Sequence, residues 1–161
     1  MEFTNAHRRA FVVDLTFAGT PEQVFPLLCP VREYDWIPGW AGTLVYSRSG
    51  IAELGCVFRT EHPAGPEIWT VSRYQPGQAI GFVRVVAGLW TVLMDLELAP
   101  TTTGQTSVRT RHTFTALSPA GAAAIDAMDE EHHRILWQNL AELAGHYLRT
   151  GTMRPEQPTP A

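Results

Sequence analysis

Six β-rich segments follow one another between residues 43 and 117, and they constrain the fold of this chain more than any other feature. Each is short and rich in β-branched and aromatic residues, and Gly, Pro or Ser separates it from the next. Their sequences are TLVYSRSG, CVFRTEHP, EIWTVSRY, AIGFVRVVAG, LWTVLMDLELAP and SVRTRHTFTAL. Because short connections join neighbouring antiparallel strands, the sequence predicts a six-stranded meander.

The N-terminal part predicts one more strand and a short helix. Residues 9–17, RAFVVDLTF, alternate apolar and polar side chains, which is typical of a half-buried strand. Thr20, Pro21 and Gln23 then follow in the order of a capping box and predict the start of a helix. Pro26 should keep this helix short or kinked.

The C-terminal part predicts one long helix. Ser118 is a suitable cap, Pro119 takes the first helical position, and the Ala- and Leu-rich pattern ends near Gly151. A twisted sheet cannot lie flat against one helix, so it should curl around the helix and leave a gap. The predicted fold class is α+β, with a seven-stranded antiparallel sheet curled around the helix in a single domain, residues 1–149. The polar, Pro-rich residues 150–161 predict a disordered tail.

Composition excludes several classes of partner. The chain has 16 acidic and 12 basic residues with Arg dispersed, so nucleic acid is not an expected partner. The N-terminus lacks the order of a signal peptide, and the longest apolar stretch is short and interrupted by Arg84, so we expect no membrane insertion and a cytoplasmic location. Cys29 and Cys56 are expected to be packing thiols. The sequence EEHH, residues 130–133, has no i, i+4 pair of His, so we expect no metal, and no motif predicts a cofactor.

The hairpin around TTTG, residues 101–104, predicts which side chains face the gap. Centring the turn there pairs Asp95 with Arg111 across the ladder. Glu97 pairs with Arg109 in the same way, and such opposed charges belong on the outer, solvated face. Alternation then sends the other set inward: Met94, Leu96, Leu98, Val108, Thr110, His112 and Phe114.

Two inward residues, Thr110 and His112, are polar, and the direction of a third polar residue, Arg84, is open. Thr110 and His112 each need a partner in the protein, a water or a ligand, because an unpaired buried polar group costs free energy. His112 is therefore either a satisfied core residue or a ligand contact. Arg84 faces outward or into the gap beside Val92, depending on one residue of register. Exposure is favoured, because a buried Arg would need a carboxylate or an anionic ligand.

A 3.6-residue period selects one stripe of the C-terminal helix for the sheet. The stripe comprises Ile125, Met128, His132, Ile135, Leu136, Asn139, Leu140, Leu143 and Tyr147. Its polar members His132, Asn139 and Tyr147 are candidates for the gap. By the same phase, Glu130, Glu131 and His133 should point outward, and His146 should interact with the last carbonyls of the helix.

Local sequence resembles a known superfamily. The stretches TPEQVFPLLCPVREYDWIPGW and EIWTVSRYQPGQAIGFVRV, and the terminal helix after LSPAGAAAI, are similar to the SRPBCC superfamily of START domains, pollen allergens and polyketide cyclases. The likeness covers about residues 8–149. It implies a helix-grip fold, in which two short helices between the first and second strands close one end of a deep apolar cavity.

The resemblance also gives a place to the unusual stretch REYDWIPGW, residues 32–40. In the superfamily, the second short helix ends in a Trp-containing turn, which Trp36, Pro38 and Trp40 match. Trp40 is expected to be mainly a structural plug, and Trp36 and Tyr34 are candidates for the pocket mouth. The neighbouring Glu33 and Asp35 are expected to be solvated charges at the rim, Asp35 being a minor candidate for contact with a ligand or a base.

The leading functional hypothesis is binding of a small hydrophobic ligand such as a lipid, an aromatic or a polyketide-like molecule. The candidate contacts are Tyr34, Trp36, Trp40, Arg84, Met94, Thr110, His112, Phe114, Met128, His132 and Asn139. No nucleophile or phosphate-binding motif is present.

A second hypothesis is a cyclase, aromatase or dehydratase with His112 or His132 as general base and Tyr147 or Arg84 stabilising an enolate. A third is a protein-interaction module with an exposed apolar patch, and a fourth is a filled core without a cavity. A monomer or a homodimer is expected.

Overall fold

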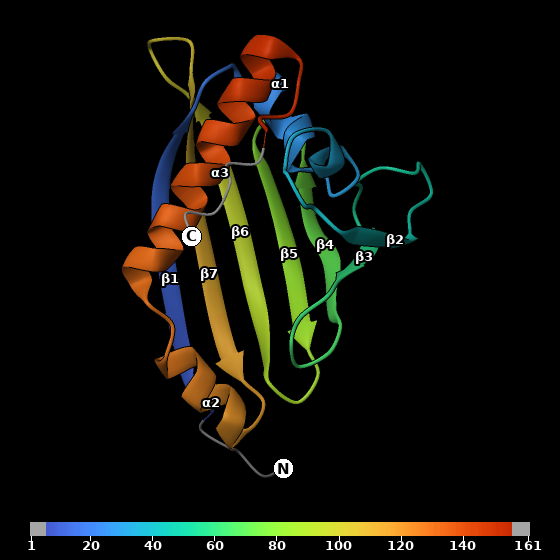
Figure 1. Cartoon of the computed structure of the whole chain (residues 1–161), viewed down its shortest axis with the longest axis vertical. Coiled ribbons are helices and arrows are strands. Elements are labelled where there is room, and N and C mark those ends of the chain that lie inside the picture. The colour runs from blue at the N-terminus through green and yellow to red at the C-terminus, as the bar shows by residue number, and fades with distance from the viewer. Residues whose placement is uncertain (1–5, 156–161) are drawn as a thin grey trace.

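The computed structural model describes residues 6–155 and forms one antiparallel sheet covered by helices on its concave side (Figure 1). The strands are β1 (Arg8–Phe17), β2 (Gly42–Tyr46), β3 (Val57–Thr60), β4 (Glu67–Gln75), β5 (Ala79–Val86), β6 (Trp90–Pro100) and β7 (Thr106–Ala116). Their order in the sheet is β1-β7-β6-β5-β4-β3-β2, so β1 and β2 form the two edges. All seven predicted strands and the α+β helix-grip arrangement are confirmed.

Short helices connect β1 to β2. Helix α1 (Pro21–Val24) begins with the predicted capping box, and the 3₁₀ helix η1 (Phe25–Leu28) follows it directly. Pro26 lies at the start of η1, where its missing N–H costs no helical hydrogen bond. A second 3₁₀ helix, η2 (Arg32–Asp35), leads into the turn that contains both tryptophans.

The prediction of a single C-terminal helix is wrong in one respect, because the structure has two helices there, α2 (Pro119–Asp126) and α3 (Glu130–Thr150). Asp129 caps α3, and its side chain accepts a hydrogen bond of 2.7 Å from the backbone N–H of His132. Arg9 donates to the carbonyl of Met128 at 2.8 Å and so satisfies a free carbonyl after α2. The break changes which face of α3 meets the sheet.

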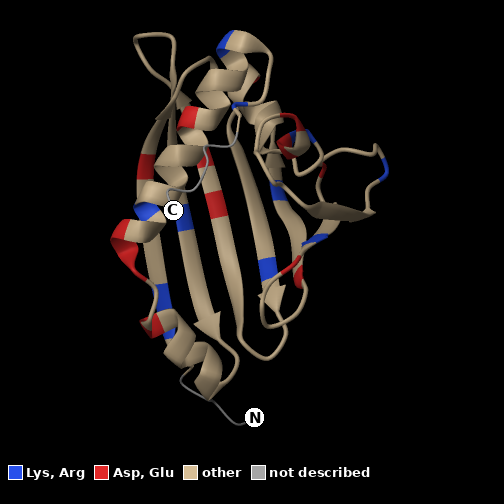
Figure 2. Ribbon diagram, in the orientation of Figure 1, with Lys and Arg blue, Asp and Glu red and all other residues tan. Residues whose placement is uncertain are grey.

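The register of the last hairpin agrees with the prediction. Asp95 pairs with Arg111, and Glu97 with Arg109. Arg109 also forms an ion pair with Asp14 of β1 at 3.2 Å, which extends the charged outer face. Figure 2 shows acidic and basic residues scattered over the helices, strands and loops.

Two clusters of buried residues form the hydrophobic core between the sheet and the helices. The larger one extends from β1 through η1 to the middle of the sheet and includes both cysteines, which are free thiols as predicted. The smaller one lies under α2, around Phe11, Trp90 and Ile125. No helix within residues 6–155 is long and apolar enough to cross a membrane. The predicted disordered tail, residues 150–161, begins where α3 ends, and its residues 156–161 lie outside the described part of the chain.

Candidate functional site

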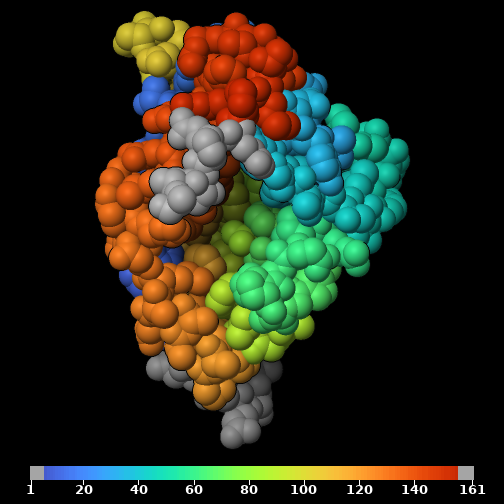
Figure 3. All heavy atoms as spheres, in the orientation of Figure 1, coloured from blue at the N-terminus to red at the C-terminus, as the bar shows by residue number. Residues whose placement is uncertain are grey.

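An apolar pocket of about 170 Å³ lies between the concave face of the sheet, α3 and the turn after η2. We call it the aromatic pocket. Its walls are Phe17, Leu28, Glu33, Trp36, Ile37, Trp40, Phe58, Trp69, Phe82, Met94, Leu96, Trp137 and Leu140. Figure 3, in the orientation of Figure 1, shows a hollow in the surface between α3 and strands β3 and β4. Four of the five tryptophans of the chain therefore surround one cavity.

The two tryptophans after η2 are held by their indole N–H groups. Trp36 is 2% exposed and donates to the carbonyl of Leu27 at 3.1 Å. Trp40 donates to the carbonyl of Pro30 at 2.8 Å. Because η1 and the turn after it supply both acceptors, these hydrogen bonds hold the two indoles in the pocket wall. Trp36 is thus a buried wall of the pocket, more deeply placed than the predicted mouth.

The remaining residues of η2 separate into an outer and an inner set. Tyr34 is half exposed, donates its hydroxyl to the carbonyl of Gly42, and does not line the pocket, contrary to its predicted place at the mouth. Asp35 is exposed and forms an ion pair with Arg32 at 2.7 Å. Glu33, by contrast, is partly buried and lines the aromatic pocket, so its predicted place as a solvated rim charge is wrong.

Among the pocket walls that residues 6–155 provide, Glu33 is the one acidic or basic residue. Its backbone carbonyl accepts hydrogen bonds from the N–H groups of Trp36 and Ile37, which anchor the start of the turn. Desolvation by the surrounding apolar side chains raises the pKa of its carboxyl group to about 8. At neutral pH the carboxyl group is therefore protonated and able to donate a hydrogen bond.

Arg84 faces the concave side, opposite Val92, and the predicted exposure is wrong. Glu67 of β4 supplies the carboxylate that a buried Arg needs, with hydrogen bonds of 2.9 Å and 3.0 Å from Arg84 Nη2 to its two oxygens. The Arg84 guanidinium also lies over the ring of Trp69, 4.0 Å from the centroid. Since Trp69 lines the aromatic pocket, the paired guanidinium packs against one residue of the pocket wall.

Thr110 and His112 are buried and inward as predicted, at 0% and 1% exposure. Within residues 6–155, neither the Thr110 hydroxyl nor either ring nitrogen of His112 has a hydrogen-bond partner. The ring of His112 packs edge-on against His133 at 4.7 Å and against Trp137 at 4.9 Å. Burial, with smaller contributions from His133 and Arg84, lowers the pKa of His112 to about 2, so its imidazole is neutral.

The face of α3 that meets the sheet differs from the prediction by about one residue. His132 and Asn139 are exposed, as are Ile135 and Leu136, so the predicted stripe is wrong at these positions. Trp137, Ala141 and Ala144 are buried instead, and His133 is partly buried against Phe11 and His112. The predicted outward direction of His133 is therefore also wrong. Burial is the main cause that lowers the pKa of His133.

The remaining candidates have separate places. Met94, one of the predicted ligand contacts, lines the aromatic pocket. Phe114 and Met128 belong to the smaller cluster under α2 and do not line the pocket. Tyr147, partly buried on α3, accepts a hydrogen bond of 3.4 Å from Arg32. The residues that sequence reasoning missed are Glu33, Glu67, His133 and Trp137.

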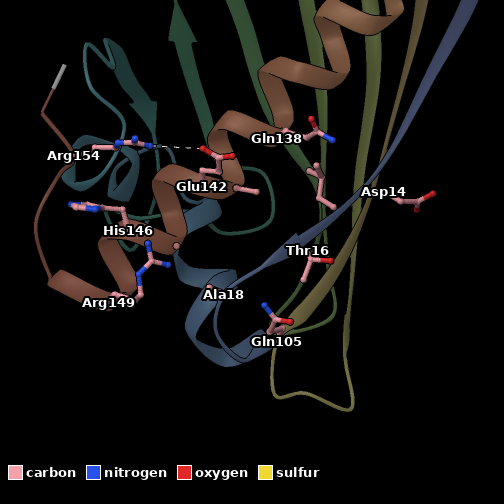
Figure 4. Close-up of a pocket in the computed structure, with 12 residues that line it drawn as sticks. Asp14, Thr16, Ala18, Gln105, Gln138, Glu142, His146, Arg149 and Arg154 are labelled. Carbon is pink, nitrogen blue, oxygen red and sulfur yellow. Dashed lines mark ion pairs between the residues drawn. The ribbon is translucent and has the colours of Figure 1, made fainter. Parts of the chain in front are cut away.

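A second, larger depression lies along the other side of α3 (Figure 4). We call it the polar groove; it has a volume of about 870 Å³ between α3, the end of β1 and the turn before β7. Its walls include Asp14, Gln105, Gln138, Glu142, His146, Arg149 and Arg154. Glu142 and Arg154 form an exposed ion pair at 3.8 Å, drawn as a dashed line in Figure 4.

No protein-family profile and no curated protein sequence matches the chain. Solved structures do match. DynU16, a protein of the dynemicin biosynthetic locus, is 15% identical with a TM-score of 0.61 over 90% of this chain and 51% of DynU16. The chain thus spans about half the length of DynU16.

Two further matches cover nearly the whole of the matched protein. Ara h 8.0201 is 14% identical with a TM-score of 0.62, over 89% of this chain and 99% of that one. CalU16 from Micromonospora echinospora is 12% identical with a TM-score of 0.57, over 94% and 88%. At such identities the likeness shows the fold alone, and it agrees with the helix-grip arrangement described above.

Proposed function

We propose that the protein binds a small, mostly apolar ligand in the aromatic pocket. The observation that carries this proposal is a cavity of about 170 Å³ enclosed by aromatic and aliphatic side chains with one carboxyl group. Such a mostly apolar wall with a single oriented polar group is typical of small-molecule sites. An apolar cavity of about 150 Å³ accepts a benzene ring, so the pocket fits one aromatic ring or a group of similar size.

Energetics also favour an occupant. A void lined by apolar side chains lacks the packing contacts of a filled core, which costs the folded state free energy. A chain selected only for a stable core would fill the space with larger side chains. A ligand that replaces the missing contacts recovers much of this free energy on binding. This argument also speaks against the hypothesis of a filled core.

The hypothesis of an enzyme with a histidine base has less support. His132 is exposed. His112 has a pKa lowered to about 2 by burial, so it is a very weak base at neutral pH. The protein-interaction hypothesis stays a prediction; its place in the fold would be edge strand β2, which exposes Leu44, Val45 and Tyr46.

Native mass spectrometry of the purified protein, followed by denaturing extraction, tests the proposal. Leu140→Trp fills the pocket from α3, and Gln138→Trp places the same side chain in the polar groove as a matched control. A molecule that co-purifies with the wild type and Gln138→Trp, but not with Leu140→Trp, supports binding in the aromatic pocket. A wild-type protein that carries nothing and takes up no lipid or aromatic compound from a panel would contradict it.

A further inference from the structure

Resting on the proposed function, we propose that the aromatic pocket selects a neutral ligand with a carbonyl oxygen on or beside a single ring, and that the Glu33 carboxyl group donates a hydrogen bond to that oxygen. The inference concerns the chemistry of the ligand. It depends on where the single carboxyl group of the wall lies and on which charges surround it.

Within residues 6–155, the carboxyl group of Glu33 has no hydrogen bond or ion pair to another protein group, and desolvation is the cause that shifts its pKa. Its neighbour Asp35, by contrast, is paired with Arg32 at 2.7 Å. The walls of the pocket that β1, η1, β3, β4, β5, β6 and α3 supply consist of apolar and aromatic side chains. Because Glu33 lines the pocket without a protein partner for its carboxyl group, that group is available to an occupant of the pocket.

The surrounding charges disfavour an anionic ligand. Arg84, the cation that lies against Trp69 of the pocket wall, already forms a two-oxygen ion pair with Glu67. Arg32 on η2 is paired with Asp35 and also contacts the Tyr147 hydroxyl of α3. Burial lowers the pKa of His112, which packs against Trp137, and that of His133, which packs against His112, so neither favours a positive charge. Among the described residues, no free positive charge therefore lines the pocket to stabilise an anion.

A neutral acceptor fits this environment better than an amine does. A cationic ligand would require Glu33 to ionise, so that two charges would be buried among indole and phenyl rings, and the desolvation cost of such a pair can exceed its attraction. A neutral carbonyl needs only the hydrogen bond that a protonated carboxyl group donates. The volume of about 170 Å³ limits the ligand, or its buried part, to one ring.

Three matched probes test the inference: acetophenone, ethylbenzene and 1-phenylethylamine, which share a ring and differ in the polar group. Isothermal titration would be run from pH 6.5 to 9.5 on the wild type, Glu33→Gln and Glu33→Leu. Quenching of tryptophan fluorescence gives a second readout, since Trp36, Trp40, Trp69 and Trp137 line the pocket.

At pH 6.5 the wild type should bind acetophenone about threefold to tenfold more tightly than ethylbenzene, the ratio that corresponds to one neutral hydrogen bond. The preference should disappear toward pH 9.5, as Glu33 ionises with its raised pKa. Glu33→Gln should keep a preference that does not change with pH, because its amide also donates. Glu33→Leu should bind ethylbenzene and lose the preference for the ketone.

Equal binding of ketone and hydrocarbon at every pH would overturn the inference and leave the proposed function standing. Tightest binding of 1-phenylethylamine, lost in Glu33→Gln, would also overturn it and assign the pocket to amines. Failure of all three probes to bind would overturn the inference of a single-ring ligand, and the native mass spectrometry described above decides separately whether the proposed function stands.

Discussion

The aromatic pocket and the polar groove both use α3 as a wall, yet they differ in almost every physical respect. The groove is about five times larger in volume, at about 870 Å³ against 170 Å³. Its side chains, however, meet solvent and one another, as the exposed Glu142–Arg154 pair shows (Figure 4). The pocket holds a carboxyl group whose pKa is raised to about 8 through desolvation by the surrounding side chains. Desolvation, more than volume, therefore identifies the aromatic pocket as the candidate functional site.

The largest difference in stability is expected between two variants that each break one ion pair, one beside the aromatic pocket and one in the polar groove. Glu67→Ala leaves Arg84 partly buried without its carboxylate, which should lower the free energy of unfolding by about 3 to 5 kcal/mol. Glu142→Ala removes an exposed partner in the groove and should change it by less than about 1 kcal/mol. Urea unfolding of both variants measures the difference, and equal losses would contradict the contrast in burial.

The pH dependence of stability should distinguish the carboxyl groups of the two regions. Glu33 has a folded-state pKa of about 8 against 4.5 for the unfolded chain, so the folded state retains the proton between these values. Its contribution to stability is therefore fully present below about pH 4.5 and is lost as the pH rises to about 8. Allowing for partial exposure of Glu33, the loss is about 2 to 3 kcal/mol.

Glu33→Gln should remove this decline of stability with pH, and it should be more stable than the wild type at pH 8.5. Glu142→Gln should keep the decline seen in the wild type. Urea midpoints at pH 5, 6.5 and 8.5 provide the measurement. An unchanged slope in Glu33→Gln would show that Glu33 titrates normally and that the pocket admits water.

Two buried threonines of β7 offer the smallest and most closely matched contrast. Thr106, next to Gln105 of the polar groove, donates its hydroxyl to the carbonyl of Gly19 at 2.7 Å. Thr110, opposite Leu96 of the pocket wall, has no partner for its hydroxyl within the described residues. Thr110→Val should therefore raise the free energy of unfolding by about 1 kcal/mol, while Thr106→Val should lower it by about 1 to 2 kcal/mol. A loss in Thr110→Val as large as that in Thr106→Val would contradict the assignment of an unpaired hydroxyl.

The sequence predicted the sheet well because its signals are local. The turn at residues 101–104 and the opposed charges of Asp95 and Arg111 determine the register of the last hairpin without knowledge of the rest of the fold. Thr110 and His112 then follow by alternation. The inward direction of Met94 is predicted in the same way, and it lines the pocket.

Predictions failed where the direction of a side chain depends on the exact helical phase or on a partner far away in the sequence. The cap at Asp129 divides the C-terminal helix, and His133 faces the sheet in place of His132. Arg84 turned inward because Glu67, 17 positions away, pairs with it. The burial of Glu33 depends on tertiary packing around η2, and a carboxylate beside an aromatic gives no sequence signal of burial.

A crystal of the protein soaked with bromobenzene tests the central claim most directly, because the anomalous signal of bromine locates the bound ring. We expect a single strong peak inside the aromatic pocket, between Trp36, Met94 and Trp137. A peak in the polar groove beside Glu142, or no ordered bromine in the aromatic pocket, would contradict the assignment of this pocket as the ligand site.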